Sequence, residues 1–130
     1  MRTPGLCLIA CLSFTSHALA GDAADAHSAP PASARQLSGG EIQSTLVGHK
    51  LSSLTESGYP FSETLNADGT STINISTEST QHGTWKVSGD VVCISYAKYG
   101  EECNYFRTDG VSYWSIDKAK NTTNNKFALH

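Results

Sequence analysis

Short stretches in which apolar and polar residues alternate run through most of the chain. Thr70–Thr77 places Ile73 and Ile75 on one face and polar side chains on the other. Alternation with a period of two is typical of strands that bury one face. It recurs in Gly83–Val87 and Val91–Tyr96, and it predicts a structural core that includes Trp85, Val87, Val92 and Ile94.

Turn residues such as Ser57-Gly58, Asp68-Gly69 and Gly89-Asp90 separate these stretches at intervals of about 8–12 residues. Such spacing is typical of an antiparallel meander that closes into a barrel or packs as a sandwich. We therefore expect a small, mainly β domain of seven to eight strands. The predicted strands are Lys50–Glu56, Pro60–Leu65, Thr70–Thr77, Gly83–Val87, Val91–Tyr96, Cys103–Arg107, Val111–Ile116 and Lys126–Leu129, with a polar connection over Asp117–Asn125.

Only one segment has a helical period. Ser38 and Glu41 fit a capping box, in which each side chain bonds the other residue's backbone N–H. Ile42 and Leu46 form an apolar face, and Gly48 is suited to end the helix. The sequence thus predicts one short N-terminal helix over residues 39–47, held by packing on the sheet.

The first twenty residues have the pattern of a secretory signal peptide. Arg2 precedes the short apolar run Leu6–Phe14, and Ala18-Leu19-Ala20 is a typical cleavage site. We therefore expect a periplasmic or secreted protein without a transmembrane segment. An alternative is a lipobox, Leu8-Ile9-Ala10-Cys11, which would attach a lipid anchor at Cys11.

After the cleavage site, residues 21–36 are rich in Ala, Ser, Pro and Asp, which predicts a flexible linker. The single β-rich domain would then span residues 37–130. Cleavage after Ala20 leaves eight Lys and Arg against twelve Asp and Glu, a formal charge of −4. This acidic balance argues against nucleic acid as a partner.

Cys93 and Cys103 are the two cysteines that remain after cleavage. An even number in an exported chain predicts a disulfide, and facing positions of a hairpin would bring the pair within reach. A zinc or redox site is the alternative, but the pair lacks a CxxC spacing and a nearby histidine. We therefore expect a disulfide and no metal.

Candidate catalytic residues are few. His49, His82 and His130 are not spaced as metal ligands, and no nucleophile motif or phosphate-binding loop is present. Glu101 and Glu102 are adjacent, so on a strand they would point to opposite faces; we expect both to be solvated at a loop tip. We therefore expect a protein that is not an enzyme and has no cofactor.

One loop is a candidate for contact with a partner. Lys98, Tyr99, Gly100 and Glu101 lie at the tip of the hairpin that the disulfide would hold. An exposed aromatic residue on a rigid loop is suited to binding.

Several of these segments occur together in a recognisable order: Leu37–Ile42, Asp68-Gly69-Thr70, Gly83–Cys93 and then Cys103. In this order the chain resembles a group of small exported proteobacterial proteins with no known function. The resemblance implies a periplasmic β domain and no catalytic residues; Phe61 stands where Trp is common in that group. Gly83-Thr84-Trp85 also resembles the G-x-W motif of lipocalins, although that motif belongs on a first strand.

These observations favour a binding or structural module that uses its loops to contact an unknown envelope protein. Two alternatives remain open. The first is a lipocalin-like carrier of a small apolar ligand, and the second is a protein inhibitor of an exported hydrolase.

Overall fold

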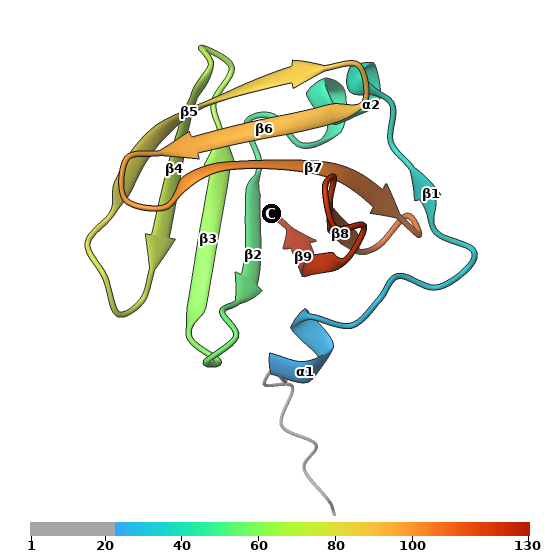
Figure 1. Ribbon diagram of the computed structural model, residues 1–130, viewed down its shortest axis with the longest axis horizontal. Coiled ribbons are helices and arrows are strands. Elements are labelled where there is room, and N and C mark those ends of the chain that lie inside the picture. Colours follow the sequence, from blue (N-terminus) through green and yellow to red (C-terminus); the bar gives the residue numbers. More distant parts are fainter. Residues whose placement is uncertain (1–22) are drawn as a thin grey trace, which may run out of the picture.

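The computed structural model describes residues 23–130, in which eight antiparallel strands form a closed barrel (Figure 1). Each strand pairs with its successor along the chain, and the last pairs with the first to close the barrel. The barrel strands are β2 (Lys50–Leu54), β3 (Pro60–Leu65), β4 (Thr70–Ile75), β5 (Gln81–Ser88), β6 (Val91–Tyr96), β7 (Gly100–Thr108), β8 (Tyr113–Asp117) and β9 (Thr123–Leu129).

The predicted fold class is therefore confirmed, and of its two alternatives the barrel is the observed one. The predicted signal peptide, its cleavage after Ala20 and the alternative lipidation at Cys11 lie outside the described residues. Within residues 23–130, the structure contains no helix that is long and apolar enough to cross a membrane.

The observed strand boundaries agree with the predicted ones where the apolar alternation is strong. β3 and β6 begin and end at the predicted residues. The last strand differs. It begins at Thr123, inside the stretch predicted to be a polar connection. Its polar side chains face the barrel interior there, where the Asn125 amide donates to the carbonyl oxygen of Leu54.

The short helix α2 (Gly39–Thr45) closes one end of the barrel. The predicted capping box is present, with the Ser38 side chain accepting from the Glu41 N–H and the Glu41 side chain accepting from the Ser38 N–H. Ile42 and Leu46 are fully buried against the interior core. The helix ends two residues earlier than predicted, and Gly48 follows with a φ of 84°, a conformation that favours glycine.

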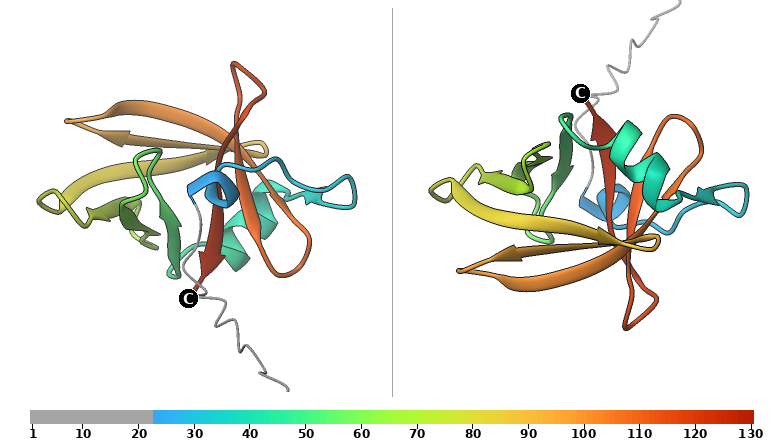
Figure 2. Two further views of the ribbon diagram at one scale, coloured as in Figure 1. Left: turned by 90° about the horizontal axis from the view of Figure 1, so that it is seen from below. Right: turned by 90° about the horizontal axis from the view of Figure 1, so that it is seen from above.

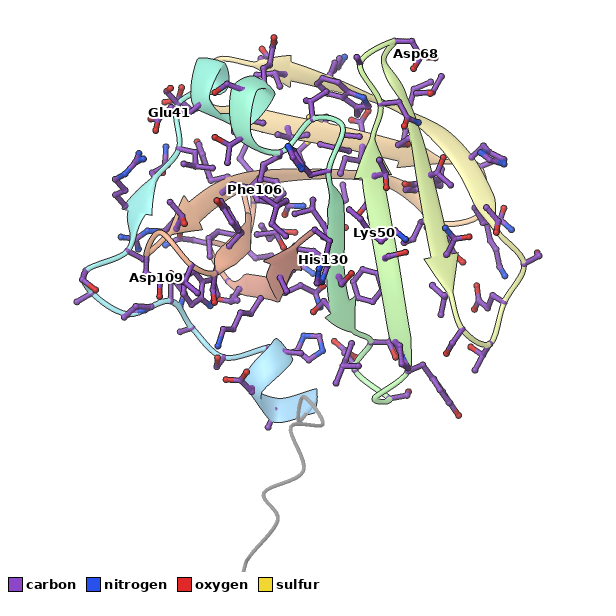
Figure 3. All side chains as sticks on the ribbon, turned by 180° about the vertical axis from the view of Figure 1, so that it is seen from behind. Glu41, Lys50, Asp68, Phe106, Asp109 and His130 are labelled. Carbon is purple, nitrogen blue, oxygen red and sulfur yellow. A yellow bond between two sulfur atoms is a disulfide. The ribbon has the colours of Figure 1, made fainter. Side chains whose placement is uncertain are left out.

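Below α2, apolar side chains from the facing strands fill this half of the barrel. Val92 and Ile94 are buried, and Trp85 and Val87 are partly buried against them, as the alternation predicted. The Trp85 indole also donates a hydrogen bond of 2.7 Å to the carbonyl oxygen of Asn66. Figure 3 shows Phe106 in this interior.

Gly83, two residues before Trp85, has a packing reason to be glycine. A Cβ atom there would lie 2.1 Å from the carbonyl oxygen of Ser95 and 2.7 Å from the ring of Tyr96. The strand therefore has no room for a side chain at this position.

The segment predicted to be a flexible linker, residues 21–36, is packed on the barrel over the part that the structure describes. It begins with α1 (Ala23–Ala26) and ends with the added strand β1 (Arg35–Gln36), which pairs with β7. We call residues 27–36 the N-terminal strap. Ala34 is 3% exposed and packs with Trp114 and Ile116 on the outer face of the barrel. Composition alone did not reveal this, because the apolar surface that the strap covers lies on distant strands.

Candidate functional site: the barrel cavity

The barrel is open at the end opposite α2. The connections 55–59, 76–80, 97–99 and 118–122 surround this end. Figure 2 shows both ends of the barrel, and α1 lies at the open one. A cavity of about 770 Å³ enters here, and a smaller hollow of about 150 Å³ shares part of its wall. Small-molecule sites in proteins typically have volumes of about 300–1,000 Å³.

Large apolar side chains form much of the cavity wall. They come from β3, β4, β6, β7 and β9, namely Phe61, Ile73, Ile75, Ile94, Phe106 and Phe127. The rings of Phe61 and Phe127 meet edge to face, with centroids 5.9 Å apart. This part of the cavity can accommodate a hydrocarbon or aromatic group.

Glu63 interrupts this apolar wall. It lies between Phe61 and Leu65 on the inward face of β3 and lines both hollows. Its Oε1 accepts a hydrogen bond of 2.9 Å from the Tyr96 hydroxyl. Burial raises the pKa of Glu63 to about 7; the Tyr96 hydrogen bond acts in the opposite direction, and the charge of Glu102 raises it further. Burial, followed by the charge of Glu63, also raises the pKa of Tyr96.

Glu102 faces the same two hollows from β7. Its Oε1 accepts a hydrogen bond from the Asn124 amide, which also donates to Asn104 Oδ1 at 2.8 Å. Asn104 is buried. The cavity thus contains two carboxylates and a small amide network beside its apolar side chains.

The mouth of the cavity is polar and partly covered by α1. His27 follows this helix, and its Nδ1 lies 2.6 Å from the carbonyl oxygen of Asn124, so the ring donates from Nδ1. An ion pair of 3.2 Å between Asp25 and Lys126 also fixes α1 to β9. Other polar residues at the mouth are Thr55, Glu56, Lys120, Thr122 and Thr123. His27 is therefore tied to the barrel, although it lies in the segment that was predicted to be a flexible linker.

Chemically, this arrangement can enclose an apolar group and offer hydrogen-bond acceptors to a donor group. A carboxyl group with a pKa near 7 can also exchange a proton at neutral pH. Ionised carboxylates accept hydrogen bonds and attract cations but cannot donate.

The candidate partner-contact loop is tied to a neighbouring loop. The Lys98 ammonium lies 2.9 Å from Glu78 Oε2, and the Tyr99 hydroxyl donates to the same oxygen. The Tyr99 hydrogen bond and then Lys98 lower the pKa of Glu78. Tyr99 is 43% exposed, Gly100 has a φ of 81°, and Glu101 points away from the barrel interior. These contacts tie the connection 97–99 to the connection 76–80 at the rim of the barrel.

The Cys93–Cys103 disulfide is present, and its cysteines face each other across β6 and β7. Both lie on the outer face of the barrel, away from the cavity. Within residues 23–130, the one group of potential metal ligands is these two cysteines with Glu101, and the disulfide occupies both sulfur atoms. His49, His82 and His130 do not line the cavity.

The prediction that Glu101 and Glu102 point to opposite faces agrees with the pairing of β7, and both side chains are exposed to solvent, as expected. They lie on β7 instead of in a loop because this strand begins at Gly100, earlier than predicted, and the Glu102 side chain lines the open part of the cavity. Glu63 is not among the site residues predicted from the sequence. A carboxylate between two inward apolar residues is a signal that the alternation of β3 could have revealed.

No protein-family model, curated protein sequence or solved structure matches the chain. The geometry of the barrel is therefore the basis for assigning a function.

Proposed function

We propose that this protein binds a small, largely apolar molecule inside the barrel, without catalysing a reaction. The observation that supports the proposal is the cavity of about 770 Å³, which opens at the end of the barrel opposite α2. A barrel of eight strands is the size at which the interior can hold one small ligand. This corresponds to the ligand-carrier alternative of the sequence analysis.

The composition of the wall supports the same proposal. Ligand sites combine apolar walls with a few placed polar groups, and here Phe61, Ile75 and Ile94 line the cavity together with Glu63 and Glu102. By contrast, Lys98 and Tyr99 are engaged with Glu78, which favours a structural role for the loop over partner contact. Binding of an envelope protein and inhibition of an exported hydrolase stay untested predictions.

The compartment is part of the proposal. The disulfide and the predicted signal peptide favour an oxidising compartment outside the cytoplasm, such as the periplasm. The resemblance to small exported proteobacterial proteins likewise stays a prediction.

A fluorescent apolar probe tests the proposed function. N-phenyl-1-naphthylamine, which is neutral near pH 7, is titrated into the folded protein and its emission is measured. We expect saturable binding of one probe per chain. Ile75→Trp places an indole in the cavity and should weaken binding at least tenfold.

Thr84→Trp provides the matched control, because Thr84 is exposed on the outer face of β5. It should leave the affinity unchanged, and thermal unfolding confirms that both variants fold. Absence of saturable binding, or equal affinities for Ile75→Trp and Thr84→Trp, would overturn the proposed function.

A further inference from the structure

We propose that the ligand carries a cationic amine, and that Glu63 and Glu102 receive it while the apolar wall holds the rest of the molecule. This inference rests on the proposed function, since it specifies the ligand class of the same cavity. Its basis is the cavity itself together with the charges that line it.

Neither carboxylate has a cationic partner in the part of the chain that the structure describes. Among residues 23–130, the ion pairs join Arg35 to Glu41, Lys98 to Glu78 and Lys126 to Asp25. Glu63 has the Tyr96 hydroxyl and Glu102 has the Asn124 amide, which are neutral donors. Glu63 is partly buried, and a charge there is costly without compensation, whereas Glu102 is exposed on the same cavity and adds negative charge to it.

The surroundings of Glu63 increase this need for a cation. The charge of Glu102 acts on Glu63 across the cavity, and Tyr96 and Tyr99 are the other titratable groups of the smaller hollow. At the mouth, the cavity wall also includes Glu56, His27 and one lysine, Lys120. Carboxylates therefore outnumber lysines in the cavity wall, which disfavours an anionic ligand.

The shape of the cavity favours an organic cation over a bare metal ion. The larger cavity, of about 770 Å³, is far larger than an ion, and its wall includes three phenylalanine rings, Phe61, Phe106 and Phe127. A protonated amine donates hydrogen bonds, which matches carboxylate acceptors, and its apolar body matches the wall. An amphiphilic primary amine satisfies both requirements.

Three probes with the same decyl chain and different head groups provide the test: decylamine, decanol and sodium decanoate. Each is titrated by calorimetry at pH 8, where an alkylamine is protonated, at concentrations below micelle formation. We expect decylamine to bind at least tenfold more tightly than decanol, a difference of about 1.4 kcal/mol. Decanoate should bind more weakly than decanol.

Matched variants locate the effect. Glu102→Gln and Glu63→Gln should each weaken decylamine binding about tenfold and leave decanol binding within twofold. Glu101→Gln removes the same charge from the next residue of β7, on the outer face of the barrel, and should change neither affinity.

The outcomes separate the two proposals. Equal affinities for the three probes, or tightest binding of decanoate, would overturn the amine inference while leaving a ligand-binding barrel. An equal loss in Glu101→Gln and Glu102→Gln would also overturn it, because a general effect of net charge would then explain the preference. Failure of all three probes together with the naphthylamine would overturn both proposals.

Discussion

Tyr96 of β6 donates a hydrogen bond of 2.9 Å to Glu63 of β3 across the barrel interior, although two strands separate them in the sheet. The contact forms because the sheet curls and brings these inward faces together. It favours the ionised carboxylate, whereas burial and the charge of Glu102 favour the protonated form, and the resulting pKa of Glu63 is about 7.

The first prediction concerns stability and pH. With a pKa of about 7 in the folded protein against 4.5 for an ordinary glutamate, folding takes up a proton at Glu63 between these pH values. The contribution of Glu63 to the free energy of unfolding therefore falls as pH rises from about 4.5 to about 7, and it stays low above that range. The change is on the order of 3 kcal/mol.

Glu63→Gln removes this dependence. Urea unfolding at pH 4.5 and pH 8 should show that the variant gains stability relative to wild type at pH 8. Glu101→Gln should show no such difference between the two pH values. An identical effect of Glu63→Gln at both pH values would contradict the raised pKa.

The second prediction concerns binding and pH. A cation interacts with ionised Glu63, so the dissociation constant for decylamine should rise about tenfold between pH 8 and pH 5.5. Histidine side chains in general also gain charge in this range, and His27 lies at the mouth. Calorimetry with Glu63→Gln distinguishes these origins, because only a role for Glu63 makes the affinity nearly independent of pH in that variant.

The third prediction concerns the disulfide. Cys93 and Cys103 are ten residues apart, and closing a loop of this size stabilises the folded state by about 2.5–3 kcal/mol in the chain-entropy model. The double variant Cys93→Ser, Cys103→Ser should lose about this much in urea unfolding. Dithiothreitol should lower wild type to the same level and leave the double variant unchanged; an unaffected wild type would exclude a stabilising role.

The fourth prediction concerns the N-terminal strap. Ala34 is buried against Trp114 and Ile116, so Ala34→Asp would place a charge in an apolar contact. We expect a loss of about 2 kcal/mol in stability and faster tryptic cleavage after Arg35. Ser33→Asp, at an exposed neighbouring position, is the control, and equal cleavage rates in the two variants would show that the strap is not held by this contact.

Much of the architecture could be predicted from local patterns. The alternation of Val92, Ile94 and Tyr96, the capping box of Ser38 and Glu41, and the even pair Cys93 and Cys103 each specify local structure through neighbours along the chain. A strand that buries alternate residues, a helix cap and a disulfide within one hairpin each depend on residues that are close together in the sequence. These features were therefore accessible without the fold.

The remaining features of the architecture depend on the closure of the sheet into a barrel. Whether the meander forms a barrel or a sandwich depends on the pairing of β9 with β2, which lie far apart in the sequence. That pairing creates the cavity and brings Glu63 and Glu102 to the same interior. On the outside of the barrel, Ala34 of the N-terminal strap packs against β8. The sequence by itself determined most of the barrel strands, the helix α2 and the disulfide. Only the tertiary structure decided the cavity and the packing of residues 23–36, because both are formed by long-range contacts and not by any single segment.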